Sequence, residues 1–555
     1  MLSLTSSAVV ILPVEKRTVP NTYYIAIGGN KRTIYYDKNN PKIKYILCGI
    51  PISNMPARML EKDDLNKIFN SFPNNIGILN GHFCGVYFKD ESISFFTDKL
   101  GLREIHIYEN ETGWYFSTRL DWLLKVNHFE IDFKEFGSRW ILINQISNKS
   151  IVKNIRRINC GSRAKIEQNR IEFIECNWFP QKSKNLNIKD FSNILSENIL
   201  VGKYDNSKIS LSLSGGMDSR VILSFLLNSD YKNWDCHTFN SSSKMDSIIA
   251  EKILQDFHIN YKMLSENDYN QGNILSELVD YIGATYITES GFISRKLMQY
   301  RLLPQEGLII DGGFGEIWRR EFLTRLYHLG KNDLINKNIK NISRYLVNHR
   351  ANIFNEEYNS IMQNGIYNQI EKIFIDLPPI KDIGLGNWLD LFSLKTRLVN
   401  YYAPEQARID SYVKAYMPFV QLNLLENLFN VSSSIKTNNR LFKEIIKSNN
   451  RKLSEYSLAK DNMSYPFVLT PLAKRIYFQV HKKFKSSNDY HDIDIYLNKL
   501  KEFVLDSVSS KSVKEYSPYN YNIINNAVKS YYKGNFDSRN FVDWFITFEI
   551  FRQIL

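Results

Sequence analysis

The pattern of apolar and polar positions changes along the chain near residue 188. Before that point, short apolar or β-branched runs alternate with Gly, Asn, Asp or Ser turns, which predicts strands. These runs include residues 8–12, 23–27, 45–47, 86–88 and 93–96. After residue 188, strands alternate with amphipathic helices, as in a parallel α/β sheet, and from about Asp333 the pattern is largely helical.

Two kinds of segment interrupt this pattern. Residues 58–72 and 133–143 have helical spacing within the β-rich part. Asn- and Lys-rich clusters near residues 331–342 and 484–490 predict solvated loops or linkers. At 555 residues the chain is too long for one core, so we expect two or three domains.

Composition and cysteine usage indicate a protein of a reducing compartment. Hydrophobic residues make up 43% of the chain, and no apolar run approaches the ~20 residues of a membrane span. The apolar run at residues 8–12 lacks a basic flank and a cleavage site, so we interpret it as a strand and not a signal peptide. Five scattered cysteines without metal spacing predict buried thiols and a cytoplasmic location.

The net charge of +13 raises the question of a nucleic-acid partner. However, the Lys and Arg residues are dispersed among Asn and Ile, and no nucleic-acid module is recognisable. The composition therefore favours neither a nucleic-acid nor a membrane partner.

The most informative motif is Ser-Gly-Gly-Met-Asp-Ser at residues 214–219. It follows an apolar run at residues 209–213 and opens a helical stretch at residues 220–227. Glycines allow phosphate to approach the backbone, and the free N–H groups of a helix N-terminus favour anions. We expect Ser214, Gly215, Gly216 and Ser219 to bind phosphate, and Asp218 to hold Mg²⁺. An ordinary capped turn is the structural alternative.

This motif resembles the pyrophosphate loop of ATP pyrophosphatases, which cleave ATP between the α and β phosphates. Over nearly its whole length, the chain resembles the asparagine synthetase superfamily. Residues 79–87, 98–102 and 155–161 are similar to motifs of its N-terminal glutaminase domain. The resemblance implies an α/β protein in two parts: an Ntn-hydrolase-like β-rich sandwich at 1–182, and a PP-loop synthetase domain with a helical C-terminal part at 183–555.

The same resemblance assigns site residues in the second part. Thr238, Phe239 and Asn240 end a strand beside the adenine pocket. Lys460, in the segment 458–467, stands where the family has a lysine that binds phosphate and stabilises transition-state charge. Pro418 and Phe419 resemble a family turn, with Tyr416 and Gln421 at its Arg and Asp positions.

A second loop, at residues 310–316, departs from the family pattern. Asp311 and Glu316 match its first and last acids, and Gly312 and Gly313 lie between them. Gly315 stands in place of the family's second metal ligand, with one residue inserted. We therefore expect Asp311 or Glu316 to join Asp218 on Mg²⁺, or the metal site to be weaker.

The N-terminal part departs further from the family. The family's nucleophile is an N-terminal Cys, and Leu2 stands in that place. The segment 48–54 has lost most polar groups of the glutamine-binding motif, and Cys84 lies inside an apolar strand. The resemblance thus implies a folded, inactive glutaminase domain, as in β-lactam synthetase and lasso-peptide cyclase.

The implied activity is formation of an amide bond at the expense of ATP, which is converted to AMP and pyrophosphate. The substrate would carry a carboxylate and an amine, with ring closure favoured and a precursor peptide among the candidates. Glu289 and Tyr286 lie where the family places substrate-side groups, although core or surface roles are equally open. A partner protease or leader-binding protein would accompany a peptide cyclase.

Three alternatives stay open at this point. One is an intermolecular amidotransferase that uses free ammonia or an external amine. Another is a tRNA-modifying pyrophosphatase, which the lack of an RNA module argues against. The last is a non-catalytic scaffold, which the Gly315 change would explain.

Overall fold

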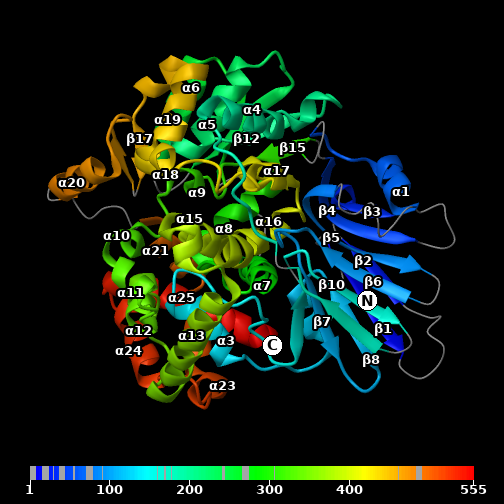
Figure 1. The fold of residues 1–555 in the computed structure, drawn as a ribbon. Helices are drawn as coiled ribbons and strands as arrows, with labels where there is room; N and C mark the ends of the chain where they lie inside the picture. Colours follow the sequence, from blue (N-terminus) through cyan, green and yellow to red (C-terminus); the bar gives the residue numbers. More distant parts are fainter. Residues whose placement is uncertain are drawn as a thin grey trace.

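The computed structural model describes residues 8–555 except 16–23, 29, 37–43, 54–56, 71–78, 90–91, 159, 168–169, 177, 241–243, 266–273, 305–306, 461 and 483–490. Leu2 and the cluster at 484–490 therefore lie outside the described residues. The fold is mixed α/β, with three larger sheets and a small hairpin (Figure 1).

Two antiparallel sheets form the N-terminal part. The first has the order β2 (Tyr24–Gly28), β1 (Ala8–Glu15), β8 (Gly113–Ser117), β7 (Ile105–Glu109) and β9 (Ile155–Ile158). The second has the order β11 (Arg170–Ile174), β10 (Arg163–Glu167), β6 (Ser92–Thr97), β5 (Leu79–Lys89), β4 (Tyr45–Ser53) and β3 (Ile34–Tyr36). Their apolar faces meet in one core, where Phe95 stacks on Phe116 with ring centroids 3.8 Å apart. The expected strands are confirmed, as are helices α1 (Lys62–Asn70) and α3 (Phe133–Ile141) within the two expected helical patches.

A five-stranded parallel sheet forms the centre of the second part. Its order is β14 (Tyr261–Leu264), β13 (Trp234–Phe239), β12 (Ile209–Ser212), β15 (Leu308–Ile310) and β16 (Lys414–Tyr416). The chain adds β13 and β14 on one side of β12 and then returns to add β15 and β16 on the other side. The strand order therefore reverses at the carboxyl ends of β12 and β15, the position where open parallel sheets typically bind ligands.

Helices surround the parallel sheet. The helix after β12, α5 (Met217–Asn228), packs against α4 (Ile188–Ile199) and α19 (Arg440–Asn449), at the top of Figure 1. The other helices that follow strands of this sheet are α6 (Lys244–Asp256), α7 (Ile274–Thr285), α8 (Gly291–Leu297), α9 (Glu316–Arg319) and α17 (Leu422–Leu425).

Beyond Asp333 the described chain is largely helical, as expected. Besides short 3-10 helices, the remaining helices of the described residues are α2 (Leu120–Leu123), α10 (Thr324–Leu329), α11 (Lys331–Ile335), α12 (Ile339–Leu346), α13 (Glu356–Asp376), α14 (Ile380–Ile383), α15 (Leu385–Ser393), the π-helix η7 (Leu394–Tyr402), α16 (Ala403–Ile409), α18 (Ser433–Lys436), α20 (Pro471–Lys482), α21 (His491–Lys499), α22 (Lys501–Ser509), α23 (Lys511–Lys514), α24 (Tyr521–Tyr532) and α25 (Arg539–Ile554). The expectation of a loop at 331–342 was wrong. Leu334, Ile342 and Leu346 bury one side of α11 and α12, while the Asn and Lys residues face solvent.

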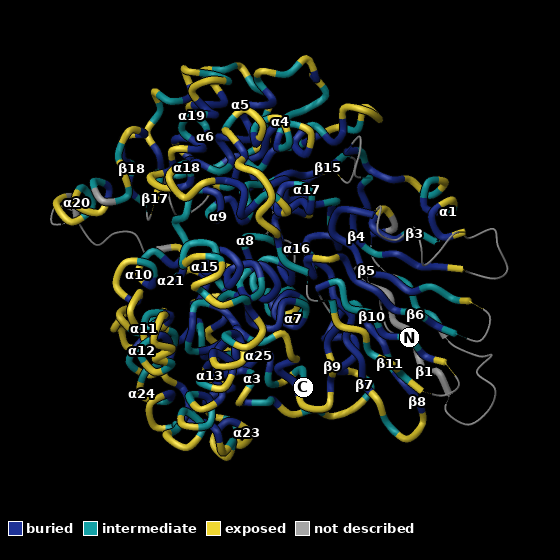
Figure 2. The backbone as a smooth tube through the Cα atoms, in the orientation of Figure 1, coloured by how far each residue is buried: buried dark blue, intermediate teal, exposed yellow. Residues whose placement is uncertain are grey.

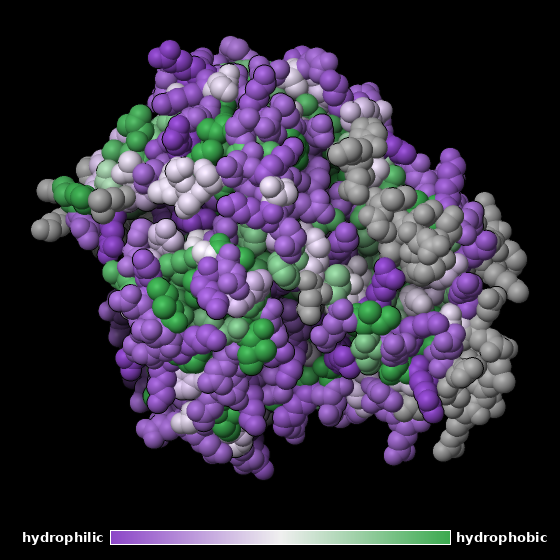
Figure 3. Space-filling model, viewed as in Figure 1, coloured by the Kyte–Doolittle hydropathy of each residue, from purple (hydrophilic) through white to green (hydrophobic). Residues whose placement is uncertain are grey.

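The two parts share a buried contact. Figure 2 shows buried backbone running from β15 through α16 to β4 and β5. The outer face in Figure 3 is mostly hydrophilic with scattered apolar side chains. Within the described ranges, no helix has both the length and the apolar character needed to cross a membrane.

Candidate functional site

The segment we call the glycine loop, residues 214–219, connects β12 to α5 as the sequence predicts. Gly216 is the N-cap of α5 and provides no side-chain cap, so the first N–H groups of this helix have no intrahelical partner. The Ser214 N–H donates to Ser219 Oγ at 3.1 Å, and the two serine hydroxyls are 3.0 Å apart. The Gly216 N–H donates to Ser214 Oγ at 3.2 Å and the Gly215 N–H to Asp246, so the loop N–H groups are used within the protein. The serine hydroxyls and the N–H groups at the start of α5 lie at the carboxyl edge of the sheet, a suitable setting for an anion.

The acidic loop, residues 311–316, follows β15 and packs directly on the glycine loop. A Cβ at Gly312 would lie 2.8 Å from Asp218 Cβ and 2.9 Å from the Ser219 nitrogen, so only glycine permits this approach. A Cβ at Gly313 would lie 2.5 Å from Met417 Sδ, beyond β16. Neighbouring strands therefore bring Gly312 beside Asp218 and Gly313 beside Met417, although the two loops are about a hundred residues apart in sequence.

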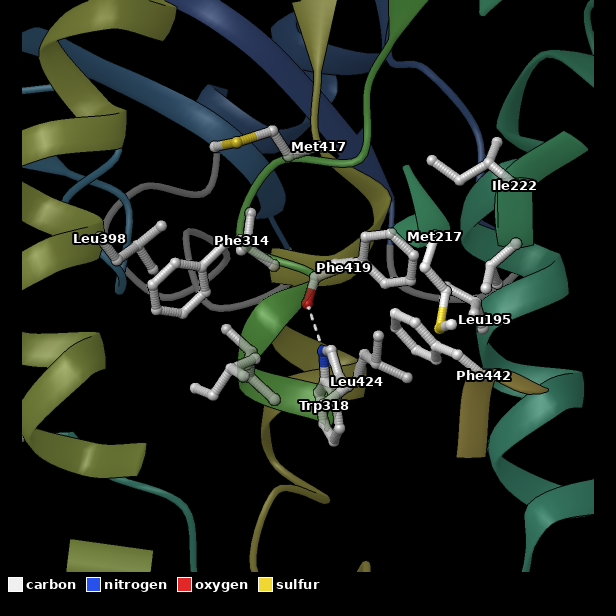
Figure 4. Close-up of a cluster of buried hydrophobic side chains, with 14 of the residues drawn as sticks. Leu195, Met217, Ile222, Phe314, Trp318, Leu398, Met417, Phe419, Leu424 and Phe442 are labelled. Atoms are coloured by element: carbon white, nitrogen blue, oxygen red, sulfur yellow. Dashed lines mark hydrogen bonds between the residues drawn. The ribbon is translucent and has the colours of Figure 1, made fainter. Parts of the chain in front are cut away.

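An apolar floor lies beneath these loops. Figure 4 shows Met217 of the glycine loop, Phe314 and Trp318 at the acidic loop, and Met417 and Phe419 after β16 meeting in one cluster. The Trp318 indole N–H donates to the Phe419 carbonyl at 3.0 Å. Each loop thus carries its own apolar anchor, which fixes the polar groups above the floor.

The residues expected to line adenine lie at the end of β13. Thr238 is buried, Phe239 is half-buried and Asn240 is exposed. The Phe239 ring meets Tyr300 edge-on, with centroids 5.2 Å apart, and the Asn240 N–H donates to the Leu264 carbonyl at 2.7 Å. Because β13 runs parallel beside β12, these residues share the edge that carries the glycine loop.

A small hairpin formed by β17 (Leu458–Lys460) and β18 (Met463–Tyr465) lies against the glycine loop. The Ala459 N–H donates to the Gly215 carbonyl at 3.0 Å, and the Gly215 N–H donates to Asp246 at 3.0 Å. Lys460, the next residue, is exposed. The structure thus places Lys460 one residue from a direct contact with the glycine loop.

A buried arginine fastens this hairpin to the loop. The Arg220 guanidinium donates to the carbonyls of Gly215 at 3.2 Å, Tyr456 at 2.8 Å and Ser457 at 2.7 Å. Burial lowers the pKa of Arg220 to about 10. Arg220 therefore joins the first turn of α5 to the segment that leads into Lys460.

Asp218 is paired with an arginine. Arg319 Nε lies 2.7 Å from Asp218 Oδ1, and Arg319 Nη2 lies 2.8 Å from Oδ2. Burial raises the pKa of Asp218, and the Arg319 charge opposes that shift. Both oxygens of the carboxylate that we expected to hold Mg²⁺ thus accept hydrogen bonds from the Arg319 guanidinium.

The other two carboxylates of the expected metal set also have protein donors. Asp311 accepts from the Gly313 N–H at 2.6 Å and from the Gln406 amide at 2.8 Å. Glu316 accepts from the Tyr402 hydroxyl at 2.9 Å and from Arg397 at 3.2 Å. In the part of the chain that the structure describes, no group of three or more His, Cys, Asp or Glu side chains is placed to hold a metal ion.

The metal set predicted from the sequence, Asp218 with Asp311 or Glu316, is therefore not assembled, and these residues as placed do not fit Mg²⁺. The physical reason is that donors from other elements satisfy each carboxylate. Sequence spacing along the two loops does not reveal such donors, because Arg397, Tyr402 and Gln406 come from η7 and α16.

Glu289 and Tyr286 have different environments. Glu289 is half-buried and accepts from the Tyr401 hydroxyl, next to the Tyr402 that contacts Glu316. Tyr286 is buried; its hydroxyl donates to Glu104, and Arg139 lies 4.7 Å from its ring centroid. Glu289 is thus linked to the acidic loop through adjacent tyrosines, whereas the recorded contacts of Tyr286 are with the N-terminal part.

Glu405 belongs to a buried polar contact near Glu289, and its protonation can be tested through the pH dependence of stability. It accepts from the Tyr281 hydroxyl at 2.6 Å and from the Thr288 hydroxyl, and burial raises its pKa from 4.5 to about 7. The Glu405 carboxyl therefore binds a proton more tightly in the folded state than in the unfolded state. The contribution of this proton to the free energy of unfolding is lost as pH rises from about 4.5 through about 7.

We expect Glu405→Gln to flatten the pH dependence of stability. The variant should exceed the wild type by on the order of 1–3 kcal/mol near pH 8, and the gain should shrink toward about pH 5. Urea unfolding at both pH values measures this difference. An equal difference at both pH values would show that Glu405 does not titrate as described.

A small cavity of about 40 Å³ lies at the contact between the two parts and not at the glycine loop. Its lining includes Cys48 and Gly49, from the segment that resembles the glutamine-binding motif, together with Cys84, His106 and Arg408. Burial raises the pKa of the Cys48 and Cys84 thiols far above the ordinary value. Neither thiol is therefore suited to act as a nucleophile.

We expect purified protein to release no glutamate from glutamine, because its described N-terminal part presents no activated thiol. The measurement is glutamate release over a heat-inactivated control, with and without ATP. Glutamate release that Cys84→Ala abolishes would contradict this expectation.

The sequence reasoning missed the charged groups that meet at the loops, chiefly Arg319, Arg220 and Lys474. Lys474 Nζ contacts Glu321 at 2.9 Å, and Glu321 in turn accepts from Arg319. One signal was available: Arg319 follows Gly315 by one helical turn, so a cation enters the loop where a carboxylate is missing.

Comparisons with known proteins give little guidance. No family model matches the chain, and no curated protein matches it in sequence. The U34-tRNA thiolase NcsA from Methanococcus maripaludis, solved with its [4Fe-4S] cluster, is 16% identical over 49% of this chain and 81% of that chain, with a TM-score of 0.18. The allosteric regulatory enzyme of purine biosynthesis is 10% identical over 60% of this chain and 74% of that chain, with a TM-score of 0.20. Both TM-scores are too low to define a shared fold.

Proposed function

We propose that the chain is an ATP-dependent amide ligase that forms AMP and pyrophosphate. The observation that carries this proposal is the position of the glycine loop, between a parallel strand and a helix N-terminus at the point where the strand order reverses. The loop has the residues of the ATP-pyrophosphatase signature that the sequence resembles. The acidic loop, the end of β13 and the β17–β18 hairpin meet the same sheet edge.

In the first step a substrate carboxylate oxygen attacks the α phosphorus of ATP. The bond between that phosphorus and the bridging oxygen breaks, and pyrophosphate leaves. The hydroxyls of Ser214 and Ser219 and the free N–H groups at the start of α5 would hold the departing phosphates. Lys460 would stabilise the charge that develops beside Gly215.

In the second step an amine attacks the acyl carbon of the adenylate. The C–O bond to AMP breaks, and the amine loses a proton as the amide forms. Glu289 would accept that proton, since a carboxylate can serve as a base; its hydrogen bond from Tyr401, next to the Tyr402 that contacts Glu316, supports this role. Because the described N-terminal thiols are inert, we infer that the amine is already on the substrate and that the product is cyclic.

Linear peptides with a free N-terminal amine and an acidic side chain test this proposal. With ATP, we expect a product lighter by one water, together with equimolar AMP. An N-acetylated peptide is the matched control, since it can be adenylated but cannot cyclise. A product that appears only when ammonium is added would favour the intermolecular alternative, and formation of ADP would contradict the ligase mechanism.

A further inference from the structure

Six charged side chains near Asp218 form ion pairs with one another. Arg319 contacts Asp218 and Glu321, Lys474 contacts Glu321, and Arg397 contacts Glu316. All six side chains are at most 20% exposed. The three carboxylates are therefore matched by three cations in a region of restricted solvent access.

Within these pairs the charges balance, and the Asp218 carboxylate already has a cation in the place where a divalent cation would bind. A metal ion at Asp218 would have to displace the Arg319 fork and leave a guanidinium buried without its partner. Breaking a buried ion pair in this way is strongly unfavourable, because it leaves a buried charge without compensation. The paired arrangement and a resident metal therefore exclude each other.

Gly315 explains why the acidic loop cannot supply a second ligand beside Asp218. A Cβ at this position would lie 2.7 Å from Asp218 Cγ and 2.8 Å from its Oδ1. No side chain can occupy that space while Asp218 stays where it is. One turn later, α9 ends at Arg319, whose longer side chain reaches the same carboxylate from a position with room.

The geometry of Arg319 leaves it able to meet a ligand. Its side chain is 14% exposed, and the recorded contacts use Nε and one hydrogen on each terminal nitrogen. One further N–H on each terminal nitrogen remains for an anion, and the planar fork suits phosphate oxygens. Although burial alone would lower it, Asp218 and Glu321 raise the pKa of Arg319, so the group stays charged.

We propose that Arg319 supplies at this loop the positive charge that a divalent cation would otherwise provide, so that the site binds pyrophosphate groups without a resident metal. This inference rests on the proposed function for the identity of the ligand. The absence of a resident metal at Asp218 rests on the geometry alone. The two parts are therefore tested by separate measurements.

The first measurement is Mn²⁺ binding to the full chain without nucleotide, followed by the loss of the free-ion EPR signal. We expect no stoichiometric site in the wild type. In Arg319→Met, the carboxylates of Asp218, Glu316 and Glu321 outnumber the cations that remain beside them. We expect this variant to bind one Mn²⁺ ion, with an affinity for Mn²⁺ at least about tenfold above that of the wild type. Arg320→Met is the matched control, because Arg320 pairs with Asp390, which Lys436 also contacts.

The second measurement is titration calorimetry with inorganic pyrophosphate in EDTA. We expect the wild type and Arg320→Met to bind, and Arg319→Met to bind at least about tenfold more weakly. Arg319→Lys should remain folded, lack the Mn²⁺ site and bind pyrophosphate with intermediate affinity.

The outcomes separate the two claims. One stoichiometric Mn²⁺ on the wild type overturns the inference, whatever the variants do. Pyrophosphate binding that requires Mg²⁺ also overturns it. If pyrophosphate binds in neither condition, the proposed function fails, and the Mn²⁺ measurement alone decides whether Arg319 excludes a metal.

Discussion

Lys460→Ala is expected to lower kcat by on the order of 10²-fold, with a smaller change in KM for ATP. Lys460 ends β17, directly after the Ala459 N–H that donates to Gly215, so its backbone lies next to the glycine loop and its side chain is exposed there. Charge develops there as pyrophosphate leaves, and a group that acts in the transition state affects kcat more than ground-state binding. The measurement is steady-state pyrophosphate release.

Two further variants sharpen this test. Lys460→Arg should rescue little, because a planar fork does not replace a compact ammonium. Lys452→Ala serves as the control; this exposed lysine contacts the Asp256 carbonyl at 3.4 Å and should keep wild-type kcat. Near-normal kcat for Lys460→Ala would mean that the hairpin is only a surface element.

Arg220→Met is expected to reduce kcat almost as strongly, by loosening the hairpin that carries Lys460. Arg220 is fully buried, and its loss leaves the Tyr456 and Ser457 carbonyls without this donor, whereas the Gly215 carbonyl keeps the Ala459 N–H. Because each hydrogen bond lost at these partly buried carbonyls costs on the order of 1 kcal/mol, we also expect a lower free energy of unfolding. Urea unfolding shows how much of the variant remains folded during the assay.

A double variant separates positioning from general instability. If Arg220 acts through Lys460, the kcat of Arg220→Met with Lys460→Ala should be close to that of Lys460→Ala alone. Arg220→Lys, which keeps a buried charge with fewer hydrogen bonds, should fall between the wild type and Arg220→Met. Independent, multiplicative losses in the double variant would contradict the positioning role.

The sequence was sufficient where local signals determine the structure. The apolar run of β12, the glycine pair and the amphipathic start of α5 are adjacent in sequence, so their order predicts strand, turn and helix. The alternation beyond residue 188 likewise predicts parallel strands with intervening helices. These local patterns place the glycine loop at the carboxyl edge of a sheet before any contact is known.

The sequence was insufficient where distant side chains decide the chemistry. Arg319 and Asp218 are 101 residues apart, and nothing in either motif indicates their pairing. The partners of Glu316 come from η7, whose π-helical turns no periodicity predicts. At α11 and α12, high Asn and Lys content concealed a narrow apolar stripe, because polar residues on the exposed face outnumber the buried ones.

The central claim is that the glycine loop serves cleavage of ATP between its α and β phosphates. Isotope exchange tests it most directly: the full chain is incubated with ATP, a panel of carboxylates that includes the linear peptides, and either labelled pyrophosphate or labelled phosphate. We predict that label from pyrophosphate enters ATP when a suitable carboxylate is present, and that Lys460→Ala slows this exchange. Entry of label from phosphate, with ADP as the intermediate product and no exchange of pyrophosphate, would contradict the account.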